Sequence, residues 1–172
     1  KQRDRLIDEA QPGDLVVISN RYIIDNWWSQ SRPASWIERP DAIPALNALA
    51  ERLSPRGVRL VLMLPTPEFP YNVLLCAPQW YRPSPSDMCA VKRAHFLQLR
   101  APIYQRVQRA LSPLIARYDP MDALCDQALC SMLDGAQLPL YMDTNHLSRH
   151  GALTLAPSML TWMRAQLNLG QK

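Results

Sequence analysis

The sequence has little glycine, no long apolar run and no visible signal peptide. Five glycines stand against sixteen prolines among 172 residues, which predicts stiff, extended connections rather than flexible linkers. No apolar run approaches the roughly 18–20 residues that a membrane-spanning helix needs, so this segment is expected to lie outside the membrane. The chain starts at Lys1 rather than at a methionine, which is typical of a fragment.

Dense basic clusters and internal repeats are also absent. The net charge of +4 is spread along the chain, with no cluster of five or more lysines and arginines, and this argues against nucleic acid as a partner. Hydrophobic residues make up 48% of the sequence and charged residues 20%, a composition typical of a globular domain with a real core. We therefore expect residues 1–172 to form a single domain.

Four cysteines fall into two close pairs, Cys76 with Cys89 and Cys125 with Cys130. An even number of cysteines in this arrangement favours two local disulfides in an oxidising compartment. Four buried, reduced thiols are the alternative, and sequence alone permits three connectivities. Neither pair has the two-residue spacing of a zinc knuckle, so a cysteine zinc site is not expected.

The chain alternates between strand and helix patterns. Short apolar runs predict buried strands at Leu15–Ile18 and in "VRLVLMLP", and a third, shorter strand is predicted in "ARYDP". Helical patterns cover residues 1–10, 41–54, 87–115 with a break near Pro102, and a C-terminal segment ending near Leu167. This alternation predicts an α/β domain in which helices cover both faces of a parallel sheet.

Polar residues follow the predicted strands. Ser19, Asn20 and Arg21 come after the first strand, and Pro65-Thr66 comes after the second. Asp143 and His146 lie in "YMDTNHLSRHGA", just before the last predicted helix. Because binding sites of parallel α/β sheets lie at the carboxyl ends of the strands, we expect these groups to share one edge of the sheet.

The Asp143-x-x-His146 spacing lets the carboxylate turn back onto the imidazole Nδ1. Such a bond fixes the ring tautomer, presents Nε2 outward and stabilises the imidazolium formed during proton transfer, as in a serine hydrolase triad. Two other interpretations stay open. Asp143 or Ser148 is a potential helix cap, and His146, His150 and Asp143 are a potential metal set, although the glutamate of His-Glu-x-x-His is absent.

The block "LYMDTNHLSRHGA" resembles the last conserved block of SGNH (GDSL-type) hydrolases. It is most similar to the extracytoplasmic SGNH domains attached to acyltransferase family 3 membrane proteins, which O-acylate bacterial surface polysaccharides. "YDPMDALCDQALCSMLDGAQLPLY" and the proline-rich loop with its two cysteines resemble the same group, and the likeness runs from about Asp14 to Ala156. The resemblance implies a flavodoxin-like α/β/α sandwich, with Asp143 and His146 as the acid and base of a catalytic triad.

The family's Gly-Asp-Ser block, which carries the nucleophile, does not occur in these 172 residues. The resemblance implies that this block, with the first strand of the sheet, precedes Lys1, so the chain is expected to be the C-terminal part of the domain. A cleaved segment, a separate polypeptide or a missing nucleophile are the alternatives. Ser19 is a weak substitute for the missing nucleophile. By resemblance to the family, Asn20 and Arg21 are candidates to donate to the oxyanion or to orient the substrate.

The resemblance implies a periplasmic enzyme that transfers or removes acetyl groups on cell-surface carbohydrate. Its expected partners are an acetylated or acceptor carbohydrate and a membrane acyltransferase domain of the same or a partner protein, which tethers it to the inner membrane. No cofactor, metal or nucleic acid is expected. The competing hypothesis is a non-catalytic carbohydrate-binding domain on the same fold, in which loop aromatics stack on sugars: Trp27, Trp28, Trp36, Trp80 and Tyr81.

Overall fold

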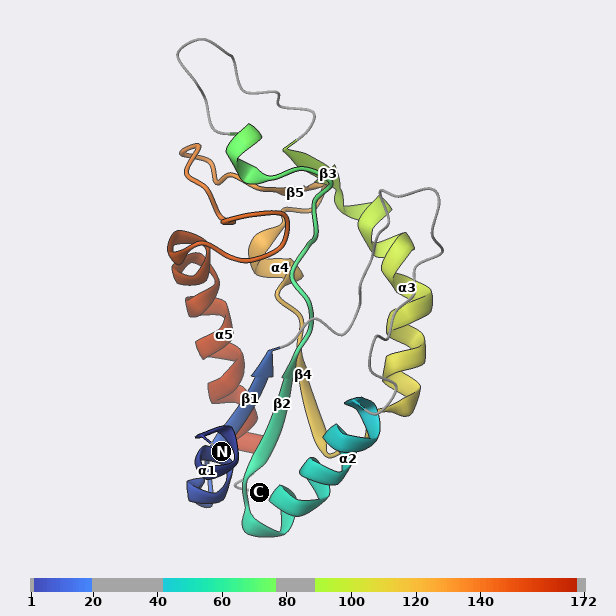
Figure 1. Cartoon of the computed structure of the whole chain (residues 1–172), viewed down its shortest axis with the longest axis vertical. Helices are drawn as coiled ribbons and strands as arrows, with labels where there is room; N and C mark the ends of the chain where they lie inside the picture. Colours follow the sequence, from blue (N-terminus) through green and yellow to red (C-terminus); the bar gives the residue numbers. More distant parts are fainter. Residues whose placement is uncertain (1, 20–41, 77–88, 170–172) are drawn as a thin grey trace.

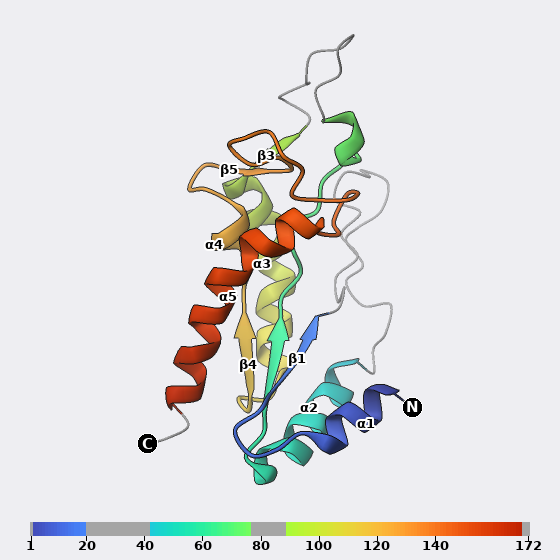
Figure 2. The same cartoon turned by 90° about the vertical axis from the view of Figure 1, so that its left-hand side faces the viewer.

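A computed structural model describes residues 2–19, 42–76 and 89–169. Its centre is a parallel sheet in the order β1-β2-β4. The strands are β1 (Leu15–Ser19), β2 (Arg59–Met63) and β4 (Ile115–Tyr118). In the register of the sheet, Val17 lies opposite Val61, which in turn lies opposite Ala116. The three predicted strands are therefore confirmed, and they point the same way in Figure 2.

Helices cover both faces of this sheet, as the sequence pattern predicted (Figure 1). The helices are α1 (Gln2–Glu9), α2 (Ala42–Leu53), α3 (Arg93–Ala110), α4 (Met121–Leu124) and α5 (Arg149–Leu169). Two short 3₁₀ turns, η1 (Ser54–Arg56) and η2 (Val73–Leu75), complete the helical elements of the described residues. None of these helices is long and apolar enough to cross a membrane.

Side-chain alternation along β2 divides the core into two layers. Leu60 and Leu62 pack in a cluster with residues of α1, α2 and α3. Val61 and Met63 point to the other face and pack with residues of α4 and α5. Both faces of the strand are thus apolar and buried, which explains its continuous hydrophobic run. The result is a three-layer α/β/α arrangement.

The predicted helix over 87–115 was too long at both ends. Ala90–Lys92 form β3, which pairs antiparallel with β5 (Leu129–Ser131) in a second, two-stranded sheet. Residues 111–114 form a turn before β4. A strand pairing made across nearly forty residues leaves no trace in local periodicity, so the sequence pattern missed it.

The predicted break near Pro102 was also wrong, since α3 continues through this position. Phe96 anchors the helix before the proline and Val107 anchors it after, each in a different buried cluster. Packing at both ends offsets the cost of one lost backbone hydrogen bond.

A separate core lies beyond the carboxyl ends of the strands, in the part of the molecule that carries β3 and β5. It contains two disulfides, Cys76–Cys89 and Cys125–Cys130, so the predicted local pairing is confirmed. Phe69 and Tyr141 meet there edge to face, with ring centroids 4.9 Å apart. Both aromatic residues are almost completely buried. We call this group, with the residues packed around it, the disulfide core.

The two disulfides should contribute unequally to stability. The Cys76–Cys89 bridge spans 13 residues and the Cys125–Cys130 bridge spans 5, and loop-closure entropy grows with loop length. Replacing Cys76 and Cys89 by alanine should lower the free energy of unfolding by about 3 kcal/mol, and replacing Cys125 and Cys130 by about 2 kcal/mol. Urea unfolding measures both values. Intact mass before and after reduction must show two bridges, and fewer than two would contradict the structure.

Candidate active site

A cleft of about 360 Å³ opens at the carboxyl edge of the parallel sheet. It is lined by Ser19, Met63, Pro65, Thr66, Glu68, Asn145, His146 and Leu147. These residues come from the ends of β1 and β2, from the segment after β2 and from the loop before α5. The structure thus brings together three polar groups that are far apart in the sequence. Asn20, Arg21 and the loop aromatics Trp27, Trp28, Trp36, Trp80 and Tyr81 lie outside the described residues.

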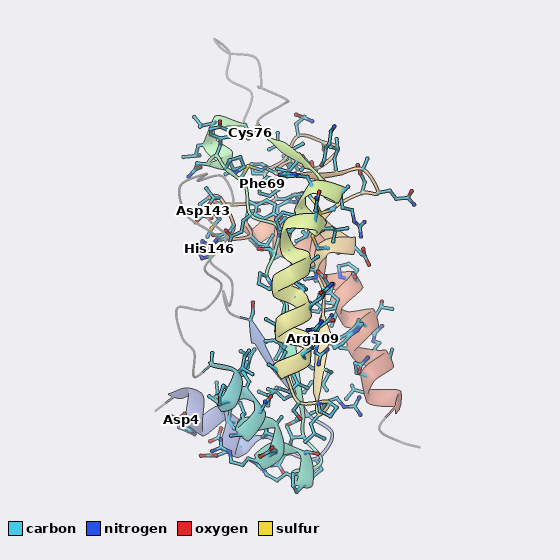
Figure 3. The ribbon with its side chains drawn as sticks, turned by 90° about the vertical axis from the view of Figure 1, so that its right-hand side faces the viewer. Asp4, Phe69, Cys76, Arg109, Asp143 and His146 are labelled. Carbon is cyan, nitrogen blue, oxygen red and sulfur yellow. A yellow bond between two sulfur atoms is a disulfide. The ribbon has the colours of Figure 1, made fainter. Side chains whose placement is uncertain are left out.

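Asp143 and His146 form a hydrogen-bonded pair at this cleft. Nδ1 of His146 lies 2.6 Å from Oδ2 of Asp143, while Oδ1 accepts the backbone N–H groups of Asn145 at 2.9 Å and of His146 at 2.8 Å. Figure 3 shows the two side chains close together, at the end of the molecule that also carries Phe69 and Cys76. Since an ionised carboxylate only accepts, Nδ1 donates in this bond, and in the neutral ring Nε2 keeps its lone pair.

The environment of Asp143 keeps its carboxyl group ionised. Partial desolvation acts to raise its pKa, but the N–H groups of Asn145 and His146 and the His146 ring together outweigh it. The pKa of Asp143 therefore lies below its usual value. An ionised Asp143 can accept a hydrogen bond from the His146 ring in either of its protonation states.

The segment after β2 holds the loop that carries this pair. The Thr66 hydroxyl donates to the Asn145 carbonyl at 2.7 Å, and the Phe69 N–H donates to the Thr144 carbonyl at 2.8 Å. Within the loop, the Met142 N–H donates to the His146 carbonyl at 2.7 Å. These bonds connect the segment after β2 to the loop before α5, so the turn that carries His146 is held in place by hydrogen bonds.

Arg100 supports the opposite side of that segment from α3. Its side chain is 3% exposed, and its Nη2 donates to the Pro65 carbonyl at 3.0 Å. The guanidinium also lies over the rings of Phe96 and Tyr104, at 4.8 Å and 4.0 Å from their centroids. Stacking of this kind accommodates a buried cation and fixes its fork of donors. Pro65 is thereby held in the cleft wall.

Ser148 is the cap of α5, as one interpretation of the sequence proposed. Its Oγ accepts the N–H of Gly151 at 2.9 Å and donates to the Pro139 carbonyl at 2.6 Å. Asp143 caps the preceding turn instead, through Asn145 and His146. Because Ser148 caps α5, Asp143 is not needed for that cap and bonds to the His146 ring instead.

His150 is not part of the cleft. Its Nε2 lies 2.6 Å from Oδ2 of Asp134, in the turn before Leu140, so it does not join His146 and Asp143 in a metal set. Within residues 2–19, 42–76 and 89–169, no group of three or more histidines, cysteines or acidic residues is placed to hold a metal ion. The first Asp–His pair places His146 at the cleft, and the second connects α5 to the turn at Asp134.

The sequence patterns missed two features of the structure, one in the cleft and one outside it. Glu68 lines the cleft and is only 4% exposed. It follows the last residue of β2 by five positions, so its place near the predicted edge of the sheet could have indicated it. The Asp134–His150 pair joins residues 16 apart, a spacing that no local pattern reveals. Ser19 lines the cleft as expected, but among the described residues no serine forms a hydrogen bond with the His146 ring.

The fold and site together define an α/β domain of the SGNH-hydrolase type, with an Asp–His pair at the carboxyl edge of a parallel sheet. The chain belongs to the family described as the SGNH domain fused to AT3 domains, which matches residues 1–161. The resemblance stated from the sequence is therefore confirmed at the level of the family.

A solved structure of similar fold is the periplasmic domain of the lipopolysaccharide acetyltransferase of Salmonella ser. Paratyphi A. The TM-score is 0.52 and the sequence identity 16%, over 90% of this chain. The match covers 57% of the other chain, so the present chain spans little more than half of that domain's length. No curated protein sequence matches this chain significantly.

Gly151 allows the first turn of α5 to pack directly against the backbone of Leu140. A Cβ at this position would lie 1.9 Å from the Leu140 carbonyl oxygen, which is far inside contact distance. Gly151→Ala should therefore destabilise the protein by about 1–3 kcal/mol, although alanine normally favours a helix. Thermal or urea unfolding measures the change.

Gly135→Ala is the matched control, because a Cβ there meets nothing within 4 Å. Its stability should equal that of the wild type. Equal stability of the Gly151 variant would contradict the close approach of α5 to Leu140.

Proposed function

We propose that this domain transfers acyl groups, acetyl above all, to or from carbohydrate at the bacterial cell surface. The observation that carries the proposal is the 2.6 Å bond between His146 Nδ1 and Asp143 Oδ2, with His146 lining a cleft at the carboxyl edge of the sheet. A pair oriented in this way supplies the base of a serine-dependent acyl transfer. Family membership supports the same chemistry.

The nucleophile in this proposal is a serine that precedes Lys1 in the complete protein, since the Gly-Asp-Ser block is absent from the 172 residues. Its hydroxyl attacks the acyl carbonyl carbon and gives its proton to His146 Nε2. The tetrahedral intermediate collapses, and His146 returns the proton to the leaving oxygen of the donor. The acyl group is then held as an ester on the serine.

An acceptor hydroxyl completes the cycle. It transfers its proton to His146 and attacks the acyl-serine, and the serine oxygen recovers the proton as it leaves. A sugar hydroxyl in this step makes the domain a transferase, and water makes it an esterase. Asp143 stays ionised throughout and stabilises the imidazolium that forms twice in each cycle.

The cleft and the disulfides support the proposed substrate and compartment. A volume of about 360 Å³ is within the range of small-molecule sites and suits a sugar ring with its acyl group. Two disulfides support an oxidising compartment such as the periplasm. The family description, an SGNH domain fused to AT3 domains, supports a membrane acyltransferase domain as partner and inner-membrane tether.

Substitution of the pair in the complete protein tests this proposal. His146→Ala and Asp143→Asn should each lower the rate of acyl transfer by about 100-fold or more, because the base or its orientation is lost. The measurement is acetyl incorporation into surface polysaccharide, with protein amounts normalised.

His150→Ala is the matched control, since it removes a second His–Asp bond of 2.6 Å that lies outside the cleft. This variant should retain transfer. Undiminished transfer in both the Asp143 and His146 variants would contradict the proposed function.

A further inference from the structure

Helix α5 carries a row of leucines that are exposed in the described structure. Leu153, Leu160 and Leu167 follow one another at intervals of seven residues, so they lie along one side of the helix. Their exposed fractions are 62%, 51% and 41%. Single exposed leucines are common on protein surfaces, but three in register on one helix form a continuous apolar ridge. We call these leucines, with the half-buried Ala156 and Met163 between them, the α5 stripe.

Another side of α5 attaches the helix to β4. The Tyr118 hydroxyl donates to Ser158 Oγ at 3.0 Å, and the ring centroids of Tyr118 and Trp162 lie 5.4 Å apart. Leu155 is buried in the same core cluster as Tyr118. Because successive residues of an α-helix are turned by about 100°, Leu160 points about 140° away from Leu155. The α5 stripe is therefore not needed to hold α5 on the sheet.

The face of the sheet that carries α5 is incompletely covered at β1. Leu15 and Val17 point to this face, since they pack with Val61 and Leu155 in one cluster, yet both are only half-buried. In Figure 2, α5 runs beside β4, and β1 lies on the other side of β2. A strand that is apolar on both faces is typical of a sheet covered on both sides. A further covering element is therefore expected over β1.

A helix in that place would contact the α5 stripe. In the sheet, β4 and β1 are separated by two strand spacings, about 10 Å. Packed helices lie about 8–10 Å apart, so a helix over β1 lies at packing distance from α5. The α5 stripe has the seven-residue spacing, with apolar residues between, by which one helix packs along another.

Two other occupants fit this surface less well. A flat bilayer would contact the leucine ridge but would not reach Leu15 and Val17, which lie in the sheet layer beneath it. A second copy of α5 would bring no acidic partner for the exposed Arg149 and Arg164, because α5 contains no aspartate or glutamate. A helix that fills the space beside α5 matches both the ridge and the half-buried strand.

We propose that the α5 stripe and the half-buried face of β1 bind an amphipathic helix from the extramembrane segment immediately before Lys1. The inference rests on the proposed function, in which that segment supplies the serine. The solved acetyltransferase domain supports this occupant, because the present chain matches only 57% of its length. Since β1 ends at Ser19 in the cleft, a helix docked over β1 holds the preceding segment next to His146.

Photo-crosslinking in the complete protein tests the docking. With p-benzoylphenylalanine at position 160, irradiation should join α5 to a peptide of the extramembrane segment before Lys1, in a product of monomer mass. Mass spectrometry of the digested product identifies the peptide. The same label at Ala165, an exposed residue on another side of α5, is the control and should give little of this product. A crosslink from position 160 to a second copy, to a membrane-spanning segment or to lipid overturns the inference, as does no crosslink.

Thermal unfolding of the complete protein gives an independent measurement. Leu160→Gln should lower the melting temperature by about 4–8 °C, because a leucine covered by a docked helix loses its apolar contacts. Leu114→Gln changes a leucine of similar exposure in the turn before β4 and should leave the melting temperature unchanged. An unchanged melting temperature in Leu160→Gln contradicts the inference. Neither failure bears on the proposed function, which fails only if transfer is undiminished in His146→Ala and Asp143→Asn.

Discussion

The carboxylate of Asp143 holds together the turn that carries His146 at the carboxyl edge of the sheet. One of its oxygens accepts two backbone N–H groups of its own turn, and the other holds the imidazole of His146. The same carboxylate therefore both closes the turn and orients the imidazole ring. Because the same bonds keep the pKa of Asp143 low, the group that shapes the turn is also charged when the histidine needs a counter-ion.

This turn is positioned by the disulfide core and by α5. Phe69 and Tyr141 pack edge to face there, and they belong respectively to the wall after β2 and to the start of the Asp–His loop. On the other side, Ser148 caps α5 and Gly151 lets the helix approach Leu140 closely. One of the five glycines thus stands where the backbone of α5 approaches the backbone of Leu140. The disulfide core and the helix cap thus hold the loop that carries Asp143 and His146 in a fixed position.

Much of this arrangement could be predicted from the sequence, because it rests on local patterns. Buried apolar runs identified the three parallel strands, paired cysteines identified the disulfides, and Asp143-x-x-His146 identified the pair. Features that depend on distant contacts could not be predicted. β3 is a strand only because β5 pairs with it, and α3 tolerates Pro102 because Phe96 and Val107 are buried at its two ends. Glu68 looked like an ordinary loop residue until the fold placed it in the cleft wall.

In the proposed function, His146 serves a serine nucleophile supplied from outside these 172 residues. A fluorophosphonate probe, which reacts covalently with activated serines, tests it most directly in the complete protein. Mass spectrometry after digestion should locate the probe on a single serine preceding Lys1, with labelling lost in His146→Ala and retained in His150→Ala. An absence of labelling, or labelling that does not depend on His146, would contradict the account.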